Sequence, residues 1–170
     1  MSGFPKLIPA FTAQLEIHPP STLGPAVAKG AGLVHVAIVQ EAGSLRSEPG
    51  YPIKLDGVFL HGADYIRVDE DQKNVRLEVQ CLARDNTTKG LVRLNYTGTI
   101  GMSGAAGKVL RGEADAGTTG FGESFIQPEF ETGCPELAEL QSKVYVGAGR
   151  FIIEPGKNVI VEYKISEVVA

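Results

Sequence analysis

Short segments of alternating polarity, each bounded by turn residues, recur along the chain and limit what it can fold into. Glycine and proline supply 21 and 10 of the 170 residues. Polar clusters at 69–74, 85–90 and 154–158 each separate two alternating segments, as expected of hairpin loops between strands. Turns this frequent favour an antiparallel meander over strands joined by helices.

The alternation itself is the period-two pattern of strands with one buried face. It is clearest from Val75 to Arg84, where apolar residues occupy every second position. The opposite face carries Arg76, Glu78 and Gln80, and it faces either solvent or the inside of a barrel. Comparable alternation occurs at 33–40, 91–100 and 159–166. We therefore predict an all-β fold, a single antiparallel β-barrel domain spanning residues 1–170.

Two segments depart from this pattern. Residues 135–143 form the one good helix candidate, which we interpret as a plug or a connection between strands. Residues 101–122 are rich in Gly, Ala and Thr and poor in large apolar side chains, so they bury little. We expect a mobile loop there, either an insertion without a role or a lid over the barrel mouth.

Composition excludes several functional classes. Hydrophobic residues make up 43% and charged residues 21% of the chain, which is typical of a folded protein. The net charge is −4, and the basic residues are scattered, which argues against nucleic-acid binding. No apolar run approaches the roughly 18 residues of a membrane span. The N-terminus lacks the pattern of a secretory signal, so we expect a cytoplasmic protein.

No metal or cofactor is expected. The three histidines, His18, His35 and His61, lie in different segments without metal-ligand spacing. Cys81 and Cys134 are far apart, so they form either a single bridge or, as a reducing compartment favours, two free thiols. A phosphate-binding loop, a nucleophile elbow and a CxxC redox pair are all absent from the sequence.

The segment His61–Tyr65 places an imidazole, a carboxylate and a phenol within five positions. On a regular strand His61 and Tyr65 share one face and Asp64 lies on the other, unless a bulge at Gly62 shifts the register. The segment is either a turn with a hydrogen-bonding aspartate or part of a binding site.

Other polar residues stand among apolar ones. His35 lies in a very apolar strand, as either a core histidine or a catalytic one. Residues 125–132 carry two aromatic residues and two carboxylates. Glu129 and Glu131 share one strand face, either exposed or buried with a raised pKa that suits proton transfer.

Three segments, in this order, resemble motifs of the family known as domain of unknown function 3237. They are 55–65, which ends in His61-Gly62-Ala63-Asp64-Tyr65, then 125–132, and 144–150 with Val146-Gly147-Ala148-Gly149-Arg150. The family patterns are G-x-v-l-x-G-G-A-D-W, Y-F-x-x-x-x-F-E-T and v-x-V-G-x-G-x-R, and the match covers about residues 12 to 168.

The departures fall at the matched positions. His61 replaces the first glycine of the pair, Tyr65 replaces tryptophan, and Phe125-Ile126 replaces Tyr-Phe. Residues 101–122 look longer than usual. The ligand is therefore expected to differ from that of ordinary relatives.

The resemblance implies a barrel similar to allene oxide cyclase, dirigent proteins and lipocalins, commonly as an oligomer. We expect a homo-oligomer, specifically a dimer, that holds an apolar small molecule in its lumen. Such barrels steer cyclisations and isomerisations, and some fungal relatives serve secondary metabolism. The expected activity is thus a cofactor-free cyclase or isomerase of secondary metabolism, for example a pericyclase such as a hetero-Diels–Alderase. The alternatives are a non-catalytic carrier of a hydrophobic metabolite and a structural oligomeric barrel filled by its own side chains.

In this hypothesis His61 and Asp64 form the catalytic pair. Aromatic residues shape the apolar wall, and Arg84 or Arg150 polarises a carbonyl group. The expected substrate-binding residues are His35, Tyr65, Arg84, Tyr96, Phe125, Gln127, Phe130, Glu131 and Arg150.

Overall fold

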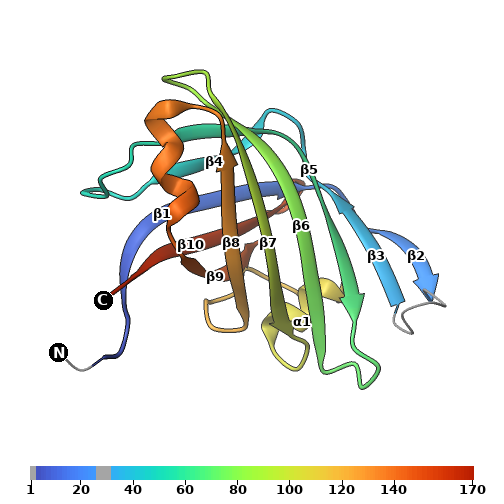
Figure 1. Cartoon of the computed structure of the whole chain (residues 1–170). Coiled ribbons are helices and arrows are strands. Elements are labelled where there is room, and N and C mark those ends of the chain that lie inside the picture. The colour runs from blue at the N-terminus through green and yellow to red at the C-terminus, as the bar shows by residue number, and fades with distance from the viewer. Residues whose placement is uncertain (1–2, 26–31) are drawn as a thin grey trace.

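A single antiparallel sheet curls into a closed barrel in the computed structural model, which describes residues 3–25 and 32–170 (Figure 1). Its strands are β1 (Lys6–Ile17), β2 (Ser21–Pro25), β3 (Gly32–Ala37), β4 (Ala42–Ser47), β5 (Asp56–Val68), β6 (Asn74–Asp85), β7 (Leu91–Gly101), β8 (Ser124–Thr132), β9 (Tyr145–Ile152) and β10 (Val159–Val169). The helices are α1 (Ala105–Leu110) and the 3₁₀ helix η1 (Pro135–Ser142). The expected all-β barrel is confirmed.

Strand order explains the closure. The sheet runs β2-β3-β5-β4-β1-β10-β9-β8-β7-β6, and β6 also pairs with β5, so eight strands form the ring in the described part of the chain. Strands β3 and β4 pair with the same edge of β5, β3 along its second half and β4 along its first. The β2–β3 hairpin therefore extends the sheet beyond the ring (Figure 1).

Alternation along the strands decides what lies inside. On β6, Val75, Leu77 and Val79 are each at most 3% exposed, whereas Arg76 and Glu78 are exposed. Burying one such aliphatic side chain contributes about 1.5–3 kcal/mol, so the pattern fixes which face points inward. The polar face of this strand consequently faces solvent.

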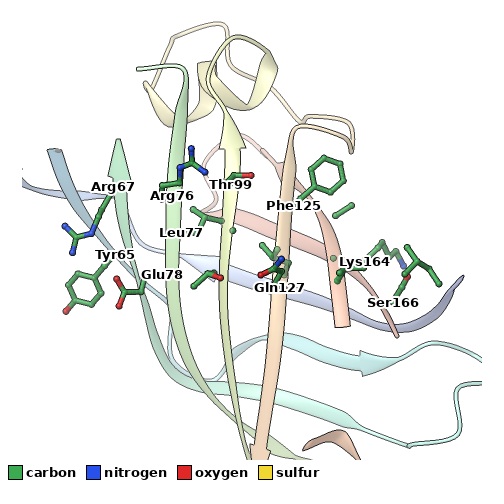
Figure 2. A pocket seen from close by; sticks show the side chains of 17 residues that line it. Tyr65, Arg67, Arg76, Leu77, Glu78, Thr99, Phe125, Gln127, Lys164 and Ser166 are labelled. Carbon is green, nitrogen blue, oxygen red and sulfur yellow. The ribbon is translucent and has the colours of Figure 1, made fainter. Parts of the chain in front are cut away.

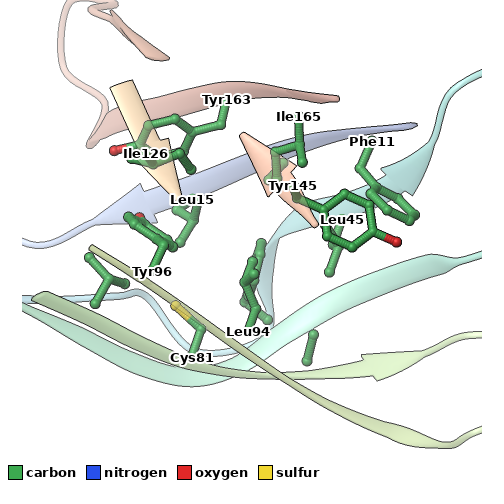
Figure 3. Close-up of a cluster of buried hydrophobic side chains, with 14 of the residues drawn as sticks. Phe11, Leu15, Leu45, Cys81, Leu94, Tyr96, Ile126, Tyr145, Tyr163 and Ile165 are labelled. Atoms are coloured by element: carbon green, nitrogen blue, oxygen red, sulfur yellow. The ribbon is translucent and has the colours of Figure 1, made fainter. Parts of the chain in front are cut away.

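One end of the barrel is filled. Phe11 packs against Tyr51, Phe130 and Tyr145 with ring centroids 5.0–5.8 Å apart. The Tyr51 hydroxyl donates to Glu167 Oε2 at 2.6 Å. Figure 3 shows Phe11 and Tyr145 at one side of the buried cluster.

The expected helix is confirmed as η1, which lies at this filled end. Its Leu137 and Leu140 side chains are each 1% exposed, and η1 contacts β8. The short helix therefore plugs this end of the barrel, which is one of the two interpretations that the sequence left open. Both described helices, of six and eight residues, fall far short of the length that crosses a membrane.

Residues 101–122 include helix α1, which the sequence did not predict. The Glu123 carboxylate accepts hydrogen bonds from the amides of Ala105 at 3.2 Å and Ala106 at 2.6 Å. Further on, Thr119 Oγ1 accepts from the Phe151 amide at 2.9 Å, which ties the segment to β9. Mobility of this segment stays a prediction. Cys81 and Cys134 are both free thiols, which is the alternative that a reducing compartment favours.

Candidate functional site

A β-bulge in β5 decides which side chains of the His61–Tyr65 segment face inward. Before the bulge Phe59 points into the barrel and is fully buried. The pairing of β5 with β6 then shifts by one residue between Phe59 and His61. Because side chains alternate, this shift puts Asp64 and Ile66 on the inner face and leaves His61 and Tyr65 exposed outside.

The other half of the barrel, away from η1, encloses a cavity of about 430 Å³, here called the lumen. This volume falls within the range of small-molecule sites. Its wall is largely aliphatic and comes from β1, β5, β6, β7, β9 and β10 together with β2 and β3, for example Leu15, Val36, Val79 and Val161. Val109 and Leu110 of α1 also line it, so α1 covers part of the lumen.

Polar groups in the lumen are few. Asp64, Tyr96 and Tyr163 lie among the aliphatic side chains, while His18 and Lys157 line the lumen from exposed positions. Among the described residues, no group of three His, Cys, Asp or Glu side chains gathers in a way that could hold a metal ion.

Asp64 is the ionisable group best placed for chemistry. Its Oδ1 accepts a hydrogen bond from the Glu78 amide at 3.1 Å. Burial raises the pKa of Asp64 from 3.8 to about 7; the Glu78 amide opposes this rise and the Glu78 charge adds to it. Near neutral pH the carboxyl therefore populates both forms, which suits a general acid or base.

Tyr96 and Tyr163 both line the lumen and pack edge to face against each other, with ring centroids 5.2 Å apart (Figure 3). Burial raises the pKa of both phenols well above the usual value, so both stay protonated and can donate hydrogen bonds. Burial likewise raises the pKa of the nearby Cys81 thiol, so this cysteine is not a thiolate nucleophile.

Two glycines of β9 make room for this arrangement. A Cβ on Gly149 would lie 2.4 Å from Cε1 of Tyr163, and a Cβ on Gly147 would lie 2.8 Å from Cγ1 of Ile126. Any side chain at Gly149 would thus displace the Tyr163 ring. Next to that ring lies the buried Ser124 Oγ, whose interaction with the Tyr163 hydroxyl partly opposes the rise in the pKa of that phenol.

Comparison with known proteins assigns the chain to a family. The family described as "Protein of unknown function (DUF3237)" matches residues 5–168. The chain belongs to this family. Comparison with curated proteins finds no match.

Solved structures share the fold of this DUF3237 chain. A conserved protein of unknown function from Rhodopseudomonas palustris gives a TM-score of 0.77 at 18% identity, covering 99% of this chain and 100% of that one. A β-barrel-like protein from Acinetobacter baumannii gives 0.71 at 20% identity, covering 99% and 98%. A structure described as an enzyme from Penicillium herquei gives 0.58 at 13% identity, covering 95% and 94%.

Each of the three DUF3237 motifs has a structural role in the barrel. The first supplies Asp64 behind the bulge, and the third supplies Gly147 and Gly149 beneath inward side chains. The second lies on β8, where Ile126 and Phe130 point inward while Phe125 and Gln127 point out.

Of the residues singled out in this DUF3237 sequence, Asp64 and Tyr96 line the lumen. The structure does not bring His61 to Asp64, because alternation along β5 beyond the bulge puts His61 on the outer face and Asp64 on the inner one. Phe130 packs in the filled end, 5.0 Å from the Tyr145 ring, and not in the cavity wall.

The remaining candidates lie on the outer surface. His35 and Tyr65 pair across β3 and β5 with ring centroids 5.1 Å apart. The charged candidates form ion pairs: Arg84 with Glu41 at 3.8 Å, Glu131 with Arg93, and Arg150 with Glu162 at 2.8 Å.

Sequence reasoning missed Tyr163. A signal for it existed, because Tyr163 shares the predicted inner face of its strand with Val159, Val161 and Ile165. A single phenol in an apolar pattern gave no reason to select it over Tyr96.

A larger hollow of about 820 Å³ lies on the outside of the barrel and is here called the outer groove. It crosses strands β5 to β10, and Tyr65, Glu78, Phe125 and Gln127 are among the residues lining it (Figure 2). Phe125 is 56% exposed there. The lumen is the stronger site for chemistry, because only there is a carboxyl group desolvated by an aliphatic wall.

Proposed function

We propose that the protein is a cofactor-independent cyclase or isomerase acting on an apolar small molecule in the lumen. The observation that carries the proposal is the Asp64 carboxyl, which stands in an aliphatic cavity with its pKa raised to about 7 by burial. The fold is shared with a structure described as an enzyme.

The lumen groups divide into three roles. Asp64 transfers a proton to or from the substrate, or donates a hydrogen bond if the reaction is pericyclic. Tyr96 and Tyr163 hold a carbonyl or hydroxyl oxygen whose charge changes during the reaction. The aliphatic wall excludes water and restricts the substrate to a reactive conformer. Isomerisation and intramolecular cyclisation rearrange bonds and protons within one molecule, so no co-reactant is needed.

A carrier would need the cavity but not the carboxyl. Raising the pKa of Asp64 from 3.8 to about 7 costs the folded protein about 4 kcal/mol at high pH. A carrier of an apolar ligand gains nothing from that cost, whereas a proton-transfer catalyst does. A purely structural barrel agrees poorly with a lumen of about 430 Å³.

The test compares wild type with Asp64→Asn in extracts of small apolar metabolites. Liquid chromatography with mass spectrometry should find one compound that wild type depletes and an isomer of identical mass that accumulates. We expect Asp64→Asn to slow this conversion by about 100- to 10,000-fold. Native mass spectrometry should find the same compound still bound to the variant.

Glu129→Gln is a matched control, because Glu129 is an exposed carboxylate on the outer face of β8. Conversion by Asp64→Asn at the wild-type rate would contradict the role of Asp64. Retention of a compound by wild type without any conversion would support the carrier instead.

A further inference from the structure

The barrel wall is interrupted beside Asp64. The β5–β6 ladder runs to the pair Asp64–Val79 and resumes in the same register at Arg67–Arg76, with the positions between them unpaired. At this interruption the Glu78 amide donates to Asp64 Oδ1 at 3.1 Å. A side-chain carboxylate thus replaces a backbone carbonyl as the acceptor, and it joins the two strands from inside the barrel.

The interrupted segment also separates the lumen from the outer groove. Leu77 borders both the lumen and the outer groove. Asp64 lines the lumen, and the exposed Glu78 side chain lines the outer groove (Figure 2). The two carboxylates therefore lie on opposite sides of one wall and are connected through the Glu78 amide.

We propose that Glu78 is a positioning residue for Asp64, which orients the carboxyl through its amide and favours its protonated form through its side-chain charge. The inference rests on the proposed function, because it assigns control of the same carboxyl. A negative charge across a thin, partly dry wall disfavours ionisation of Asp64, so Glu78 favours the protonated form, which can act as a general acid.

The other buried groups that interact with Asp64 carry no charge that could take this role. Cys81 on β6, Tyr96 on β7 and Tyr163 on β10 interact with Asp64, and burial keeps all three neutral. His18 and Lys157 line the lumen from exposed positions.

Two arginines share the outer groove with Glu78. Arg76 forms an ion pair with Asp69 at 2.6 Å, and Arg67 also lines the groove. Within the described residues Glu78 forms no ion pair with either of them. Its charge is therefore not cancelled by a direct partner.

The test is a ¹³C NMR titration of the carboxyl groups in ligand-free wild type, Glu78→Gln and Glu129→Gln. The Asp64 signal is assigned by its absence from Asp64→Asn. Glu78→Gln keeps the backbone amide and removes only the charge, so a merely structural role would leave the Asp64 midpoint unchanged. We expect the midpoint to fall by roughly 0.3–0.5 pH unit in Glu78→Gln, as suits one screened charge, and to stay unchanged in Glu129→Gln.

An Asp64 midpoint in Glu78→Gln equal to that of wild type would overturn the inference. Equal shifts in Glu78→Gln and Glu129→Gln would also overturn it, because the effect would then reflect net charge alone. The titration needs no substrate, so failure of the proposed catalysis leaves its outcome unaffected, and the two failures can be told apart.

Discussion

Replacing Asp64 by asparagine should stabilise the folded protein above neutral pH. The folded carboxyl binds its proton more tightly than the unfolded one, because burial raises its pKa from 3.8 to about 7. The stability associated with this group is complete below the unfolded pKa and is lost as pH rises through the folded pKa. The full loss corresponds to about 4 kcal/mol, and asparagine, which does not ionise, avoids it. Its side-chain carbonyl can still accept the Glu78 amide.

The assay is urea unfolding of wild type and Asp64→Asn at a series of pH values from 4 to 8.5. The difference in unfolding free energy should favour the variant increasingly with pH, by up to about 4 kcal/mol, at equal m-values. Asp56, Asp85 and Glu167 have lowered pKa values and so give the opposite slope. They do so in both proteins, and the difference isolates Asp64. Stability curves that stay parallel over this range would refute the reasoning.

Three further predictions follow from the packing of the barrel. Gly149→Ala should lower the free energy of unfolding by roughly 1–3 kcal/mol in urea titrations, because its Cβ would overlap the Tyr163 ring; unchanged stability would contradict this packing. Leu110→Ala opens the part of the lumen that α1 covers, and it should release a captured ligand faster in time-resolved native mass spectrometry. In a thiol-reagent assay on the native protein, Cys134 should react and Cys81 only on unfolding, since Cys81 is 3% exposed.

Much of the fold could be predicted from local pattern, because burial of one strand face imposes a period of two. The alternation at 75–84 predicted which side chains of β6 point inward, and the structure agrees. The helix over 135–143 was also visible locally, from a short apolar pattern after Gly133 and Cys134. Helix α1, within residues 101–122, could not be predicted, because six helical residues held by Glu123 are too few to give a periodic pattern.

The candidate site was harder to predict, because its geometry depends on pairing between distant segments. The bulge before His61 is a property of the β5–β6 register, and it inverts the facing of every later side chain of β5, including His61, Asp64 and Tyr65. Alternation also cannot tell which end of a barrel is filled. Phe130 does point inward, but it lies at the end that Tyr51 and η1 close.

The expected dimer stays a prediction, which size-exclusion chromatography with light scattering can check.

The central claim is that an apolar molecule binds inside the lumen, and native mass spectrometry of two neighbouring variants tests it most directly. Val161→Phe fills the lumen, and Ile160→Phe adds the same ring to the outer face of the same strand. After incubation with a metabolite extract, wild type and Ile160→Phe should retain a small molecule that denaturation releases, and Val161→Phe should lose it. Equal retention by Val161→Phe would place the ligand elsewhere, and bare protein in every sample would contradict a binding lumen.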